Sequence, residues 1–428
     1  MIPIYRQKEK TRLFERLAKR RTAISGEVVD TVRDILEQVR EGGDKALLRL
    51  TEKLDRVKLT EWQLRVRPQA LRAAAAKADP AVVREMEKAI FNIHAYHKHQ
   101  LQESWEFSTR GVTLGQRVLP LDSVGIYVPG GSAAYPSSVL MNVIPAKIAG
   151  VPRIVVVTPP GTFKKHPVIA AALRELNVHE IYLVGGAQAI AALAFGTDTI
   201  APVDKIVGPG NAYVAAAKRE VFGQVDVDMI AGPSEVIILA SAESNPRYIA
   251  ADMLSQAEHD EFACALCFTD SVSHAVLVRR EVELQLESLP RQDIAWKSLE
   301  NFGAIVVTEN YFQAADWIDE LAPEHLEIFS SIPRSAVDLV RNAGAIFYGD
   351  YSPEAVGDYF AGSNHVLPTG GTARFFSPLG VYHFQRRTSI IRYSQNELSR
   401  TWRSIETLAR AEGLEAHARS VRIRQSDG

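Results

Sequence analysis

Residues 180–196, EIYLVGGAQAIAALAFG, join a short apolar run to a glycine pair and an alanine-rich apolar stretch. The apolar run is typical of a strand that is buried on both faces of a parallel sheet, and the stretch after the glycines is typical of a helix. The same order recurs at VGIYVPGG (124–131), RIVVVTPPG (153–161) and KIVGPGNAYVAAAKREVFG (205–223). Repeated units of strand, turn and helix predict an α/β domain with a parallel sheet.

The glycine turns of these units indicate a nucleotide site. None of them is a complete GxGxxG motif, and GPGNAY (208–213) is only a fragment of one. Glycines at the carboxyl end of a strand still let an anionic group approach the amides at a helix N-terminus. We therefore expect a nucleotide or dinucleotide here, with tight structural turns as the alternative.

A second α/β unit follows this segment. After AGPSEVIILAS (231–241), the chain returns to helix and strand with FACALCFT (262–269), GAIVVT (303–308) and WIDELAPEHLEIFS (317–330). Residues 1–100 have helical patterns. Because a second α/β unit follows the nucleotide-like segment, that segment is predicted to be inserted between two halves of another domain. The expected fold has two incomplete Rossmann-like parallel-sheet domains, a helical N-terminal arm and a helical, charged C-terminal tail.

The overall composition excludes several classes of protein. A chain of 428 residues is expected to form two or three domains, and its 46% hydrophobic and 23% charged residues are typical of globular proteins. The formal net charge of −2 gives no reason to expect nucleic acid or an anionic membrane as a partner. No apolar run approaches the ~20 residues that span a bilayer. The basic start lacks the apolar segment of a secretory signal, so we expect a cytoplasmic protein.

Two groups of residues imitate metal or redox motifs. Cys264 and Cys267 have CxxC spacing, but they lie in an apolar run that predicts a buried strand, and no second cysteine pair exists. His94, His97 and His99 lie in a polar helical stretch where only the first two share a face. We expect the cysteines to be buried in the sheet and the histidines to lie on a solvated helix surface.

The stretch SQAEHD (255–260) lies on a predicted helix that begins at Asn245-Pro246, a favourable cap and first residue. At helical spacing, Asp252, Gln256 and His259 lie side by side along the margin of the apolar face. Surface hydrogen bonds are the usual explanation of such a group. A metal site requires further ligands from elsewhere in the chain.

Further polar residues of this kind occur later in the sequence. Glu324 and His325 follow Pro323 at a corner between helix and strand, and Asp358 lies in a short helix that begins at Ser352-Pro353. The others are His365, Glu412 and His417. Amide, carboxylate and imidazole ligands suit zinc without any thiolate.

The motifs GIYVPGG, VGGAQAIAALAFGT, IVGPGNAYV, AGPSE, SQAEHD, APEHLEI and GSNHVLPTGG occur in the order in which the histidinol dehydrogenase family has them. The sequence resembles that family from about residue 20 to its end. The resemblance implies oxidation of L-histidinol to L-histidine through the aldehyde, the last step of histidine biosynthesis. It also implies two NAD⁺-dependent steps and one Zn²⁺ ion per active site.

The resemblance assigns roles residue by residue. It implies that four side chains hold zinc, namely Gln256, His259, Asp358 and His417. It implies that these four also contact the substrate, together with Ser234, His325, His365 and Glu412. The dinucleotide contacts that it implies are Tyr127, Gln188 and Asn211. The tail residues come from the partner subunit in this family, so the resemblance implies a homodimer with shared active sites.

These roles lead to predicted domain boundaries. We expect an N-terminal arm (1–22), a catalytic zinc domain (23–126 and 241–379), an NAD-binding domain (127–240) and a C-terminal tail (380–428). The tail is predicted to complete the active site of the partner.

Two successive oxidations require two proton acceptors. Aldehyde oxidation by hydride loss needs a hydrate or a covalent adduct first, and the cysteines are predicted to be buried and unreactive. Glu324 is therefore expected to activate water for the second step, and His325 to take the alcohol proton in the first. The alternatives are a related zinc- and NAD-dependent dehydrogenase that acts on another amino- or hydroxy-alcohol, and a non-catalytic nucleotide-binding protein.

Overall fold

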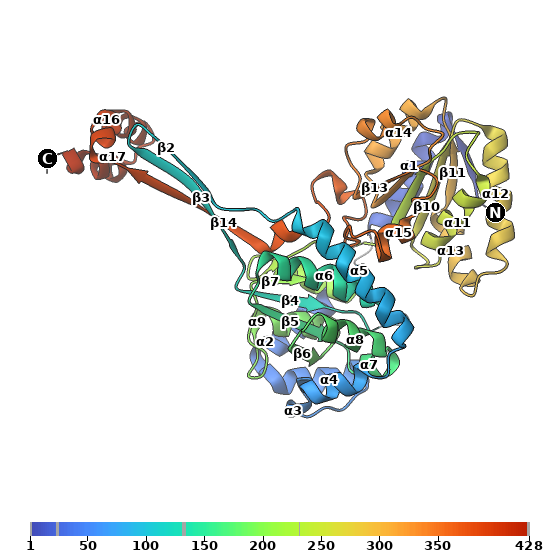
Figure 1. Ribbon diagram of the computed structural model, residues 1–428, viewed down its shortest axis with the longest axis horizontal. Coiled ribbons are helices and arrows are strands. Elements are labelled where there is room, and N and C mark those ends of the chain that lie inside the picture. Colours follow the sequence, from blue (N-terminus) through green and yellow to red (C-terminus); the bar gives the residue numbers. More distant parts are fainter. Residues whose placement is uncertain (1, 23–24, 131–133, 231, 426–428) are drawn as a thin grey trace.

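The computed structural model describes residues 2–22, 25–130, 134–230 and 232–425, and Figure 1 shows two α/β bodies and a long arm. The first body contains a five-stranded sheet in which every pair of neighbouring strands is parallel. Its strands are β4 (Ser123–Tyr127), β5 (Arg153–Thr158), β6 (Glu180–Leu183), β7 (Lys205–Val207) and β8 (Asp226–Val227). The order β6-β5-β4-β7-β8 is that of a doubly wound fold.

Helices cover both faces of this sheet, which explains why its central strands are largely apolar. One core joins the sheet to α4 (Pro68–Ala75), α5 (Pro80–Lys98), α6 (Pro136–Ala149) and α8 (Pro167–Glu175). The other joins it to α2 (Gly26–Asp55), α9 (Gly186–Phe195) and α10 (Ala212–Val221). The short helices α3 (Glu61–Leu64) and α7 (Thr162–Lys165) complete this body.

The second body contains a six-stranded sheet that is also parallel throughout. Its strands are β1 (Ile4–Arg6), β9 (Glu235–Leu239), β10 (Cys264–Thr269), β11 (Ala304–Val307), β12 (His325–Ile328) and β13 (Ala345–Tyr348). The order is β1-β11-β10-β9-β12-β13, so its last five strands repeat the order of the first sheet. Because β1 precedes the first body and β9 follows it, that body is inserted in the second, as the sequence predicts.

The second sheet is likewise covered on both faces. One core contains α11 (Pro246–Ala257), α12 (Val272–Leu286) and α13 (Gln292–Phe302). The other contains α1 (Lys10–Ala18), α14 (Tyr311–Leu321) and the 3-10 helix η3 (Arg334–Leu339). The remaining short helices are α15 (Glu354–Tyr359), η1 (Gln7–Glu9), η2 (Lys19–Thr22), η4 (Thr372–Arg374), η5 (Val381–Phe384) and η6 (Ile423–Gln425).

The arm is a three-stranded antiparallel sheet that ends in two helices. Its strands are β2 (Trp105–Thr109), β3 (Val112–Pro120) and β14 (Gln385–Tyr393), in the order β14-β3-β2. Figure 1 shows the arm projecting from the first body, with α16 (Gln395–Ala411), α17 (Glu415–Arg422) and the C-terminus at its far end.

The packing differs from the predicted boundaries in three places. The N-terminal segment contributes an edge strand as well as a helix, because Ile4–Arg6 pairs with β11. The helices within residues 26–98 cover the first sheet and not the second, to which the boundary of 23–126 assigns them. The tail after residue 380 contains the long strand β14 as well as helices. Among the residues that the structure describes, no helix is long and apolar enough to cross a membrane.

Candidate functional site

Glu324 and His325 face the same side because the chain turns sharply before them. Helix α14 ends at Leu321, and Ala322 adopts a left-handed conformation with φ +52°. The backbone of Glu235, the first residue of β9, then contacts both side chains. Its N–H donates to Glu324 Oε2 (2.9 Å), and its carbonyl lies 3.2 Å from His325 Nδ1. The backbone of Glu235 therefore orients His325, the predicted base, and Glu324, the predicted water activator, together.

The His325 imidazole is held as a neutral base. A carbonyl oxygen can only accept, so Nδ1 carries the ring proton and Nε2 presents its lone pair. Within the described residues, Nε2 has no hydrogen-bond partner, and it lies 3.8 Å from Asp358 Oδ1. Burial lowers the pKa of His325 to about 3, and the charges of His259 and His365 act in the same direction. Nε2 is thus unprotonated.

The Glu324 carboxyl is buried beside other acids. Burial raises its pKa well above the usual value, and the charges of Glu235 and Asp358 add to this shift. The hydrogen bond from the Glu235 amide and the charge of Arg20 oppose it. A carboxylate with a raised pKa is a stronger base toward water, so the position suits the predicted role.

Helix α11 begins as the sequence predicts, but it ends before His259. The Asn245 side chain accepts from the amide of Arg247, and the helix finishes at Ala257, so His259 lies in the following turn. The expectation that Gln256 and His259 share a helical face is therefore corrected. The two are adjacent all the same, with 3.2 Å between Gln256 Nε2 and His259 Nδ1.

The acids near this helix differ in part from the predicted group. Asp252, also on α11, hydrogen-bonds Glu327 of β12. Asp358, on α15, lies near His325, and burial raises its pKa to about 7. His325, Glu354 and Asp358 offer ligand atoms that all lie within 4.8 Å of one another.

Glu354 and Glu327 are site residues that the sequence interpretation missed. Glu354 is buried, and its Oε1 lies 3.7 Å from His325 Nδ1. Its amide donates to Glu327 Oε1 at 2.7 Å. An acid in the first turn of a short helix has an ordinary explanation in the helix dipole, so no sequence signal distinguishes Glu354.

The cluster has the unpaired ligand atoms that a metal ion requires. Several buried nitrogen and oxygen atoms in it have no hydrogen-bond partner among the described residues, namely Gln256 Oε1, His325 Nε2, Glu354 Oε2 and His365 Nε2. Burial also raises the pKa of the neighbouring carboxyls, which a bound cation would relieve. This donor set of oxygen and imidazole nitrogen fits zinc.

The other predicted substrate contacts lie in two places. Ser234 immediately precedes Glu235 and is half-buried, as is His365, whose pKa burial lowers to about 4. Glu412 and His417 are exposed at the end of α16 and on α17, at the far end of the arm from β12 and α15 (Figure 1). A single chain therefore does not bring the tail residues to the cluster.

The predicted dinucleotide contacts lie at one edge of the first sheet. Tyr127 ends β4, and its hydroxyl accepts from the Gly186 amide at 3.1 Å. Gln188 lies in the first turn of α9, where its Nε2 donates to Asp55 Oδ2 at 3.3 Å. Asn211 caps α10, with its side chain accepting from two amides of the first turn. All three follow the carboxyl ends of parallel strands, where such sheets bind nucleotides.

The two misleading motifs have different outcomes. Cys264 and Cys267 are buried in β10, as predicted, and burial raises the pKa of each thiol to about 12. The expectation of a solvated surface is wrong for His97, which is fully buried and lies 2.7 Å from Gln100 Oε1 through its Nδ1. His94 and His99 are exposed.

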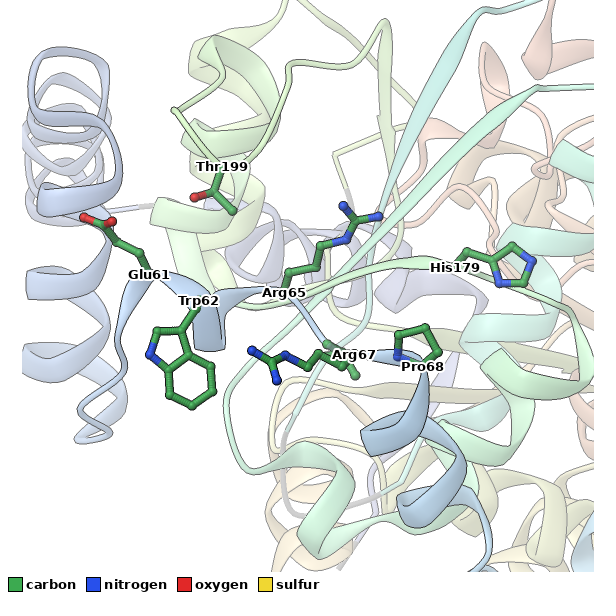
Figure 2. Close-up of a pocket in the computed structure, with 8 residues that line it drawn as sticks. Glu61, Trp62, Arg65, Arg67, Pro68, His179 and Thr199 are labelled. Atoms are coloured by element: carbon green, nitrogen blue, oxygen red, sulfur yellow. The ribbon is translucent and has the colours of Figure 1, made fainter.

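A separate cavity lies on the first body, away from these residues. Figure 2 shows its lining, in which Arg67 lies over the ring of Trp62 with 5.1 Å to the centroid. His179, also in the lining, precedes β6 and so marks the edge opposite to Gln188. None of the predicted site residues contributes to it.

Comparisons with known proteins agree on one family. A family model described as histidinol dehydrogenase matches residues 18–425. The histidinol dehydrogenase of Geobacillus kaustophilus is 54% identical over 413 residues, which are 96% of this chain and 97% of that protein. That of Bacillus subtilis is 52% identical over 415 residues, 96% of this chain and 97% of that protein. The crystal structure of histidinol dehydrogenase from Elizabethkingia anophelis is similar with a TM-score of 0.92 at 33% identity, covering 100% of this chain and 98% of that one.

Proposed function

The chain belongs to the histidinol dehydrogenase family, and we propose that it oxidises L-histidinol to L-histidine through the aldehyde, the last step of histidine biosynthesis. The proposed reaction uses two NAD⁺ molecules in succession and one zinc ion per site. One observation carries the proposal. The backbone of Glu235 contacts both Glu324 and His325, beside a cluster of unpaired metal-ligand atoms.

His325 serves the first oxidation in this proposal. Its Nε2 takes the proton of the substrate hydroxyl while the carbon loses hydride to NAD⁺, which leaves the aldehyde. The low pKa of the buried ring ensures that Nε2 is unprotonated when the alcohol arrives. The carbonyl of Glu235 holds the other ring nitrogen and fixes this orientation.

Glu324 serves the second oxidation. Its carboxylate takes a proton from water as the oxygen adds to the aldehyde carbon, and the resulting hydrate loses hydride to a second NAD⁺. A thiol adduct has no support, because both cysteines are buried and their pKa values of about 12 keep them protonated. The product of the second step is the carboxylate of histidine.

Gln256, His259 and Asp358 are proposed to hold zinc, together with the partner subunit's His417. When bound, the ion supplies a fixed anchor for the imidazole and amino nitrogens of the substrate, which orients its alcohol carbon. Ser234 and His365 are proposed to contact the substrate from the same chain, and the partner subunit's Glu412 from the other. NAD⁺ is proposed to bind at the edge marked by Tyr127, Gln188 and Asn211.

Loss of one proposed ligand should release zinc. The Asp358→Asn variant removes a negative charge from the donor set, so its zinc affinity should fall by more than the roughly 10- to 100-fold that loss of a supporting partner costs. Zinc retained in competition with a chromophoric chelator measures this. Asp338→Asn, on the exposed face of η3, is the matched control and should retain zinc like the wild type. Equal retention by both variants would remove Asp358 from the ligand set.

A shared active site is proposed because the tail residues lie far from the cluster in one chain. The arm exposes apolar side chains along its strands, including Trp105, Phe107 and Ile391. Exposed apolar surface of this kind is typical of a surface that contacts another chain. A homodimer in which each arm reaches across to the other subunit would place His417 and Glu412 beside the partner cluster.

A further inference from the structure

Arg20 makes an unusually complete set of contacts for a residue in a short N-terminal segment. It lies in η2, and only 6% of it is exposed. One terminal nitrogen of its guanidinium forms an ion pair with the Glu235 carboxylate. The other donates to the carbonyls of Pro233 and Ser234, and Nε donates to the carbonyl of Phe262 at 2.7 Å. The planar fork is therefore used on all three of its nitrogens.

These contacts surround the backbone of Glu235, which orients the proposed catalytic pair Glu324 and His325. The amide of Glu235 holds Glu324, its carbonyl holds His325, and its side chain is bound by Arg20 on one oxygen and by the Gly370 amide (3.0 Å) on the other. The carbonyls that Arg20 also binds belong to Pro233 and Ser234, the two residues just before Glu235. Arg20 thus contacts Glu235, and Glu235 contacts both reacting groups.

We propose that Arg20 is a positioning residue, which fixes the backbone of residues 233–235 so that the N–H and the carbonyl of Glu235 aim Glu324 and His325 together. This inference rests on the proposed function, because the roles of those two side chains come from it. It connects the N-terminal segment, which no motif marks as functional, to both half-reactions. The backbone of Glu235 contacts both groups, so any loss of its position must weaken both oxidations.

The chemistry of the guanidinium explains why arginine is required here. Lysine would keep the positive charge, but its ammonium is a point donor on a flexible stem and cannot bind a carboxylate and several carbonyls in fixed directions. A displacement of about 1 Å at a reacting group is enough to cost up to about 100-fold in rate. Complete removal of the charge would instead leave the buried Glu235 unpaired, which is strongly destabilising.

The chain offers a matched control in Arg16. Arg16 lies on α1 in the same segment, and its guanidinium donates to the carbonyls of Glu300 (2.5 Å), Asn301 (2.7 Å) and Gly303 (3.2 Å). It anchors the segment to the second body as Arg20 does, but its contacts are with the end of α13 and not with residues 233–235. The same Arg→Lys substitution therefore separates anchoring from positioning.

The experiment measures NADH formation from histidinol and from the aldehyde separately, in Arg20→Lys and Arg16→Lys. Arg20→Lys should lower kcat of both half-reactions by about 10- to 100-fold, with zinc content and the KM for NAD⁺ close to wild type. Arg16→Lys should keep both kcat values within about threefold, whatever its effect on thermal unfolding. An equal fall in the two variants, or a loss confined to one half-reaction of Arg20→Lys, would overturn the inference.

A second variant covers the case in which Arg20→Lys fails to fold. The double variant Arg20→Gln with Glu235→Gln removes the ion pair without leaving a buried unpaired charge. It should show the same joint loss of kcat, and wild-type rates would overturn the inference. Failure of the proposed function is distinguishable, because the wild-type protein would then form no NADH from histidinol.

Discussion

Replacing Glu324 with glutamine should stop the reaction at the aldehyde. Glutamine keeps an oxygen that accepts from the Glu235 amide, so the local geometry is preserved, but it cannot take a proton from water. Loss of a general base typically costs about 10²- to 10⁴-fold, and this loss should fall on aldehyde oxidation alone. Alcohol oxidation should remain within a few-fold, because His325 is untouched. Rapid-mixing assays that start from histidinol and from the aldehyde measure the two steps.

Glu320→Gln is the control for this prediction. Glu320 is a half-exposed acid in the last turn of α14, four residues before Glu324, and it pairs with Lys10 at the surface. Its substitution should leave both steps unchanged. If Glu324→Gln slows the two half-reactions equally, the division of labour between Glu324 and His325 is wrong.

Mixing two inactive variants should restore activity if the sites are shared. His325→Gln removes the proposed base of the main body, and His417→Ala removes the proposed ligand of the tail. Each alone should lose more than about 100-fold. In a mixed dimer, the intact body of one subunit meets the intact tail of the other, so random pairing should recover about a quarter of wild-type activity.

Co-expression of the two variants, with assay of the unsorted dimers, measures this recovery. Mixed dimers purified through two different affinity tags should reach about half of wild-type activity, because one of their two sites is intact. If each tail served its own subunit, every site in the mixed dimer would carry one of the two substitutions. Activity at the level of the single variants would therefore contradict a shared site. The tail, which Figure 1 shows at the far end of the arm, would then have to reach the cluster of its own chain.

The parallel sheets were predictable because their signals are local. Runs such as Arg153–Thr158 and Cys264–Thr269 are apolar over a strand length and end at turn residues, which is the pattern of a strand covered on both faces. The strands of the arm carry no such signal. All the residues of β2 and most of those of β14 are exposed, so no buried apolar run marks them.

Contacts between distant segments were beyond the reach of the sequence pattern. The amphipathic helix α2 shows that it has an apolar face, but not which of two sheets that face covers. His97 looks solvated in a polar helix, and its burial depends on contacts with Gln100 and Asn364 that follow only from the fold. Glu354 is a similar case, since its neighbours come from other elements.

The position of the candidate site also departs from the general rule for parallel sheets. Tyr127, Gln188 and Asn211 follow their strands, as the rule for nucleotide sites requires. Glu235 and His325 begin their strands, so the candidate cluster lies at the amino edge of the second sheet. The sheet pattern alone would have placed it at the opposite edge, and only the family motifs indicated His325.

The central claim is a four-electron oxidation on one zinc-dependent site, and the yield of NADH per L-histidinol consumed tests it most directly. The measurement uses full-length protein of known zinc content, before and after chelation. We predict two NADH per histidinol, lost on chelation and restored by zinc. One NADH with release of the aldehyde would contradict the account, as would oxidation of other alcohols without any turnover of histidinol.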